Sequence, residues 1–243
     1  MEVHAHTHTA RKKWTHYFWE FLMLFLAVFC GFFAEYQLEH KIEKDKGKEY
    51  IRSMIEDLQT DTANLVTVVN RFDRFEMRAD TVLSYLPAIT VGYNDTLWRN
   101  LVMGFPDFIK SDRTMQQLTN SGGMRLIKNK KAADGIINYD LGYKDLLLDI
   151  EALSRITDRY FMCMSEIIDF ASLEADRKKM TGNEMQASGK NYLLSLDKLR
   201  LGKLYNEIHF LKMIAKPVRQ QEEILKTNAI DLIQLLKKEY HLK

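Results

Sequence analysis

An apolar, aromatic stretch near the start of the chain limits the fold more than any other feature. Residues 14–36 read WTHYFWEFLMLFLAVFCGFFAEY and are almost free of charge, with Glu20 near the beginning. As a helix, the 20 residues from 17 to 36 would be about 30 Å long, which matches the hydrocarbon core of a bilayer. The uninterrupted apolar part, 21–34, is shorter and taken alone also suits a signal peptide or a buried helix.

The flanks of this stretch distinguish among the three alternatives. Basic residues at 11–13 precede it, and aromatic residues lie at both ends, as at the two interfaces of a membrane span. Cleavage after Ala34 would place Phe32 where a signal peptidase needs a small residue. A lipoprotein signal needs a small residue before its cysteine, but Cys30 follows Phe29. We therefore predict an uncleaved transmembrane helix at 14–36, with the lipid bilayer as its partner.

One narrow face of this helix differs from the rest. At 100° per residue, the positions on it are Glu20, Met23, Ala27, Gly31 and Ala34. Small residues four apart allow two helices to approach closely in lipid, so this face is a candidate for self-association into a homo-oligomer. In the alternative interpretation the pattern is accidental, and Glu20 extends toward the interface.

The rest of the chain has the sequence features of long helices. Only 3 prolines and 11 glycines occur in 243 residues, and strand-type alternation is nearly absent. Residues 37–50 alternate acids and lysines and predict a solvated helical stalk, with Gly47 as its bend. Apolar residues then recur by threes and fours over 51–86, 136–171 and 193–240, which predicts three long helices. Pro87 ends the first, whereas Pro217 should kink the third without ending it.

Turn residues separate these helices. Within 88–129 we expect two short helices, at 96–103 and 112–119, with Asn94 and Ser111 as N-caps. Residues 177–192 form a second, polar connection. If each connection reverses the chain, the three helices are antiparallel neighbours. The predicted fold is all-α: a transmembrane helix, a stalk, and an elongated coiled-coil-like bundle at 51–243 with a small helical cap at 88–129.

The N-terminal tail, 1–13, is the one candidate metal site. His4, His6 and His8 alternate, and neutral imidazoles can hold a divalent transition metal. No carboxylate or cysteine accompanies them, so a flexible tail whose charge varies with pH is the competing interpretation. We expect no other cofactor.

The sequence gives no support for catalysis or for nucleic-acid binding. Net charge is only +2, with 28% charged residues of both signs spread along the chain, so we expect no nucleic-acid partner. The glycine pair in LTNSGGMRLIKNK lacks the spacing of a phosphate loop, and is best explained as a turn. Carboxylate pairs at Glu56/Asp57 and Glu222/Glu223 are expected on solvated faces, and Cys163 as a packed thiol. The chain is not predicted to be an enzyme.

Several motifs resemble those of a known but uncharacterised family. HTARKKW, WEF, AEYQLE, EYIRSMIEDLQTD and LTNSGGMRLI are similar to motifs of bacterial envelope proteins that have one N-terminal span and a helical soluble domain. The resemblance covers about the first 140 residues of the chain. It implies a bacterial inner-membrane anchor with a cytoplasmic N-terminus and a periplasmic domain, and it carries no catalytic residue. Basic residues occur on both sides of the span, so charge alone does not fix this orientation.

Three functions are compatible with these features. The leading one is a structural or interaction protein, a homo-oligomeric scaffold or an accessory subunit that accompanies another envelope protein. The second is a periplasmic module in which the cap senses a ligand or partner. The third makes Glu20 an ion or proton site among associated spans.

Overall fold

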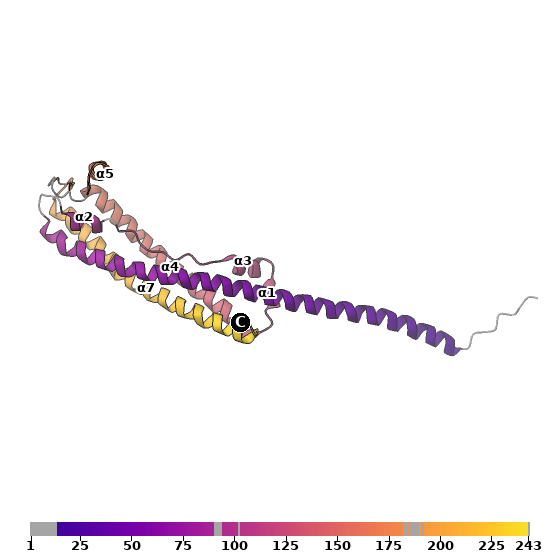
Figure 1. The fold of residues 1–243 in the computed structure, drawn as a ribbon. Helices are drawn as coiled ribbons and strands as arrows, with labels where there is room; N and C mark the ends of the chain where they lie inside the picture. The colour runs from indigo at the N-terminus through magenta and orange to yellow at the C-terminus, as the bar shows by residue number, and fades with distance from the viewer. Residues whose placement is uncertain are drawn as a thin grey trace, which may run out of the picture.

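The computed structural model describes residues 14–89, 94–101, 103–181, 184, 190 and 192–242. Helices make up nearly all of this part of the chain, and it contains no named strand, so the all-α class is confirmed. The molecule is elongated, and one helix projects far beyond the others (Figure 1).

Three long helices build the molecule: α1 (Trp14–Tyr85), α4 (Lys130–Ile167) and α7 (Lys198–Glu239). The shorter elements are η1 (Leu86–Ala88), α2 (Asp95–Leu101), α3 (Arg113–Asn120), η2 (Gly123–Leu126) and α5 (Phe170–Lys179). The predicted span, stalk and first bundle helix are thus one continuous helix. Helix α7 also continues through Pro217, as expected.

Side-chain caps fix the start of several helices. Asn94 accepts from the backbone N–H of Leu97, as predicted for α2. Asn129 and Asp197 cap α4 and α7 in the same way. The prediction that Ser111 caps α3 is wrong, because that helix begins after Asp112 and takes its cap from α1, as described below.

The segment after α2 does not form a cap on the tip of the bundle; it returns along the side. The ring of Phe105 lies edge-on to that of Phe72, with centroids 5.0 Å apart. Farther along, the backbone N–H of Ser111 donates to Asp61, a residue nearer the start of α1. Residues 103–112 therefore run opposite to α1 and carry the chain back toward the projecting end.

This return changes the relative directions of the helices. Helix α4 starts near the base, where its Tyr139 bonds to Asp61, and reaches Leu101 with Tyr160. Helices α1 and α4 consequently run in the same direction. The antiparallel arrangement expected from sequence holds for α7, which runs against both of them and ends beside Asn129.

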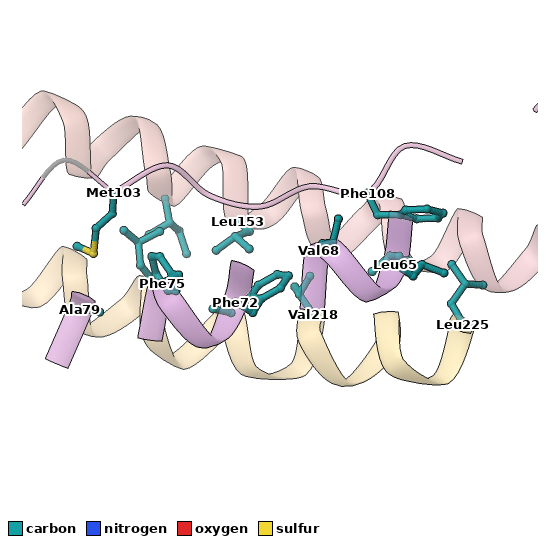
Figure 2. Packing of buried hydrophobic residues seen from close by; sticks show 14 of the residues in the cluster. Leu65, Val68, Phe72, Phe75, Ala79, Met103, Phe108, Leu153, Val218 and Leu225 are labelled. Carbon is teal, nitrogen blue, oxygen red and sulfur yellow. The ribbon is translucent and has the colours of Figure 1, made fainter. Parts of the chain in front are cut away.

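The hydrophobic core lies where α7 packs against both α1 and α4 (Figure 2). Residues 103–112 cover the remaining side, and Met103 and Phe108 point from this segment into the core. Because α1 touches both α7 and the returning segment, its buried stripe is wider than a coiled-coil seam. It adds Met54, Val68 and Phe75 to the positions that the three-four rhythm predicts.

At Gly47, helix α1 passes close to the backbone of Leu126 and is not interrupted. A Cβ atom at this position would lie 2.5 Å from the backbone oxygen of Leu126. Helix α1 continues through Gly47, which is buried. The missing side chain lets η2 pack directly on α1 at the base of the bundle.

Candidate functional site

The first part of α1 is the most exposed apolar surface in the described structure. By length and composition it is the one helix there that could cross a membrane, and none of its most apolar window is buried. Phe21, Phe32 and Leu24 expose 65%, 69% and 70% of their surfaces. Fully burying one such side chain is worth about 1.5–3 kcal/mol, so a surface this large indicates that something apolar covers it.

Two sides of this helix carry different residues. Phe21, Phe25, Phe29 and Phe33 stack one above the next, with ring centroids 6.1 to 6.4 Å apart. The face with Ala27 and Gly31 lies on the opposite side at 100° per residue. A Cβ built on Gly31 has no atom within 4 Å. Gly31 therefore has room for a close neighbour.

Glu20, on the same face as Gly31, has a partner within its own helix. Its carboxylate lies 3.2 Å from the Nε2 atom of His16, one turn earlier. This pair of polar side chains lies near the start of the apolar stretch. Met23 and Ala34 complete the face, and both are exposed.

A second polar cluster, which the sequence interpretation missed, lies buried between α1, α3 and α4. Asp57 was expected on a solvated face, but it is only 4% exposed. Its carboxylate accepts from the backbone N–H of Thr114, 2.8 Å away, and from Arg113, 3.0 Å away. An aspartate of α1 thus caps the N-terminus of α3, where unpaired N–H groups favour a negative charge.

Asp61, one turn farther along α1, holds two other segments. It accepts from the backbone N–H of Ser111 at 2.6 Å and from the hydroxyl of Tyr139 at 2.8 Å. Burial raises the pKa of Asp61 above its usual value, although these two hydrogen bonds oppose that effect. Burial of the Tyr139 hydroxyl, together with the charge of Asp61, strongly raises the pKa of Tyr139. The hydroxyl therefore keeps its proton and donates it in the hydrogen bond.

Lys110 and Asp140 form the ionic part of this cluster. They are bonded to each other, and Asp140 also meets Lys144 at 2.8 Å while Lys110 meets Asp112 at 3.0 Å. Burial opposes the charged form of Asp140, but the lysine hydrogen bonds outweigh it and lower its pKa. The space among the residues of the cluster is about 10 Å³, roughly the room of one water molecule. The cluster therefore fastens the returning segment to the bundle and has no room for a ligand.

Glu222 is the other departure from expectation. The pair Glu222/Glu223 was predicted on a solvated face, but Glu222 is fully buried in the α7 seam, and neither of its oxygens has a hydrogen-bond partner. Burial, with a smaller effect of Asp107, raises its pKa to about 8. An acid in this position is neutral at moderate pH and destabilises the bundle when it ionises.

The predicted metal ligands His4, His6 and His8 lie outside the described residues. Within the described part, no three of His, Cys, Asp and Glu gather in a way that could hold a metal ion. Cys163 is half-buried, and burial raises the pKa of its thiol, which makes the nucleophilic thiolate less available.

Comparison of the chain with models of known protein families, with curated proteins and with solved structures found no match.

Proposed function

We propose that this chain is a membrane-anchored structural or interaction protein in which residues 14–36 span a bilayer. The observation that carries the proposal is the contrast within α1. Its first part is apolar and exposed on all sides, whereas from Ile51 onward one side of the same helix is packed into a bundle core. A lipid bilayer, together with neighbouring copies of the same helix, would cover such an exposed apolar surface, which supports the proposal.

The proposal assigns the anchor to the inner membrane of a bacterium, with the N-terminus in the cytoplasm and the bundle in the periplasm. The sequence motifs support this orientation, whereas the basic residues lie on both sides of the span and do not decide it. It includes no catalytic step. The buried polar groups around Asp57, Asp61 and Lys110 serve to hold residues 103–120 onto the bundle.

Self-association through the small-residue face is part of the proposal. The open surface at Gly31, with Ala27 one turn earlier, allows two backbones to approach, and the stacked phenylalanines then face the acyl chains. A homo-oligomer made in this way would present several bundles side by side to another envelope protein.

Cysteine labelling in membranes tests the anchor and its direction. In a Cys163→Ser background, we expect Cys30 to resist a membrane-impermeant maleimide until the bilayer is dissolved in denaturing detergent. Lys46→Cys, in a chain without both natural cysteines, should be labelled in spheroplasts but not in sealed inside-out vesicles.

Each outcome of this labelling has a distinct meaning. Rapid labelling of Cys30 in intact membranes would contradict the span. Labelling of Lys46→Cys only in inside-out vesicles would keep the span and reverse the orientation. Lys46 is exposed, so the cysteine itself should not disturb the fold.

A further inference from the structure

A large open pocket lies at the base of the bundle, where α1 leaves it. Its volume is about 690 Å³, and it is formed by α1, by the segment after η2, and by the C-terminal end of α7. Figure 1 places the C-terminus beside this point of departure. Neither the self-association face nor the buried cluster contributes a residue to it.

The pocket carries more basic than acidic groups that remain available. Lys44, Lys48 and Lys128 line it, against two acids. One acid, Glu43, is paired with Lys128 at 3.4 Å and lies 3.9 Å from His40, whereas the other, Glu239, accepts a hydrogen bond from the neutral amide of Asn129 and keeps its charge. Among the described residues, Lys44 and Lys48 have no ion-pair partner, so the pocket favours an anion.

The position of the pocket along α1 indicates which anion is near. His40 lines its lower edge, and its ring lies against that of Tyr36, with centroids 4.7 Å apart. Tyr36 is the aromatic residue that closes the proposed span. At 1.5 Å per residue, the backbones of His40, Lys44 and Lys48 are about 6, 12 and 18 Å beyond it, and the headgroup layer of a bilayer is about 5–8 Å thick. The membrane-side edge of the pocket, at His40, therefore lies at the level of the headgroups, and Lys44 and Lys48 follow it on the bundle side.

The backbone at the C-terminal end of α7 adds a separate observation. His241 has a φ of 52°, the left-handed conformation that glycine usually adopts after a helix. The N–H groups of His241 and Leu242 bond back to Lys238 and Lys237 and close the last turn of α7. A histidine here costs about 1 kcal/mol relative to glycine. It places a second imidazole in the lining of the pocket.

We propose that this basal pocket binds the anionic headgroup of a membrane phospholipid. The long side chains of Lys44 and Lys48 supply unpaired positive charge that can reach back toward the headgroup, Lys128 adds a charge that it shares with Glu43, and His40 and His241 supply further hydrogen-bond donors. Bound lipid would link the bundle to the membrane surface at a second point. The inference rests on the proposed span, since that span places the pocket at the headgroups.

Reconstitution of the full-length protein in nanodiscs tests this inference. The discs contain phosphatidylcholine alone or with one fifth phosphatidylglycerol, and the melting temperature of the bundle is followed by circular dichroism. We expect the anionic lipid to raise the melting temperature of the wild type. The triple variant Lys44→Gln, Lys48→Gln, Lys128→Gln should lose this rise, and its retention of phosphatidylglycerol on native mass spectrometry should fall about fivefold per lysine.

Matched variants separate the pocket from general charge effects. Lys178→Gln with Lys179→Gln removes exposed charges from α5 at the far end of the molecule and should keep the effect of the lipid. His241→Gly relieves the left-handed strain, so it should fold at least as well as the wild type while it binds lipid more weakly.

The outcomes test the headgroup site separately from the proposed membrane span. Equal lipid effects on the wild type and the lysine variant would overturn the headgroup site and leave the span intact. An equal effect of inorganic phosphate, added to phosphatidylcholine discs, would also overturn it, because the pocket would then be a site for soluble anions. Failure of the protein to enter discs at all would instead contradict the span.

Discussion

The backbone N–H of Thr114 donates to the carboxylate of Asp57, 2.8 Å away on another helix and 57 residues earlier in the chain. This bond joins the start of α3 to the middle of α1, and it determines where the returning segment lies. Arg113 meets the same carboxylate, and Ser111 meets the next buried acid, Asp61.

Removal of this cap should destabilise the bundle. We expect Asp57→Ala to lower its free energy of unfolding by about 1–3 kcal/mol, because a buried N–H and Arg113 both lose their acceptor. Glu56→Ala is the matched control, since Glu56 is exposed and meets only Arg113, at 3.3 Å. Its effect should stay below about 1 kcal/mol. Thermal unfolding of the full-length protein in detergent measures the loss of stability in each variant. Equal losses in the two variants would contradict the interpretation of Asp57 as a cap.

Glu222 should make the stability of the bundle depend on pH. Its pKa is about 8 in the folded protein against 4.5 for an ordinary glutamate, so the folded state binds more protons between these values. The contribution of Glu222 to stability should therefore be full below about pH 4.5 and be lost as the pH rises toward 8. Glu222→Gln should remove this component of the fall, and Glu223→Gln, on the neighbouring position, should not.

An apolar residue at this position should also stabilise the bundle. At pH 8 we expect Glu222→Leu to raise the free energy of unfolding by about 1–3 kcal/mol, because the acid is fully buried without a hydrogen-bond partner and Asp107 opposes its charge. The measurement is the melting temperature of the variant and wild type at pH 5 and pH 8. A wild type that is as stable at pH 8 as at pH 5, with no gain in the variant, would contradict the burial of an unpaired acid.

A side chain at Gly47 should disturb the base of the bundle. We expect Gly47→Ala to cost about 1–3 kcal/mol of stability, since its Cβ would meet the backbone oxygen of Leu126 at 2.5 Å. Gly202→Ala is the control, because that helical glycine of α7 has no atom within 4 Å of an added Cβ. The control should gain up to about 1 kcal/mol from helix propensity. If Gly47→Ala also gained stability, the close approach of η2 to α1 would be wrong.

The sequence was sufficient to predict the long helices and most of their buried positions. Apolar residues by threes and fours give a local signal that does not depend on the rest of the fold. The same spacing also fits Glu222, between Val218 and Leu225, and Asp61, between Leu58 and Leu65. Glu222 was expected on a solvated face because burial of an acid is costly, whereas at the other position the sequence pattern assigns the stripe to Thr62 and predicts nothing for Asp61.

The course of residues 103–120 could not be predicted in the same way. Turn residues indicate that the chain changes direction, but they do not indicate which distant surface it then follows. That course depends on Asp57 and Asp61, whose partners are separated from them by 50 or more residues. The basal pocket likewise exists only because α1, the residues after η2 and the end of α7 meet at one place.

The mass of the full-length protein, extracted gently and measured by light scattering with the detergent subtracted, tests the central claim most directly. We expect a dimer or a larger whole multiple of 28.6 kDa for the wild type and for the Phe29→Leu variant, whose change lies on the side with the stacked phenylalanines. Gly31→Leu should shift the protein to 28.6 kDa, because a bulky residue blocks the close approach of two helices. A wild type that is monomeric with nothing bound, or an oligomer that Gly31→Leu leaves unchanged, would contradict self-association through the span.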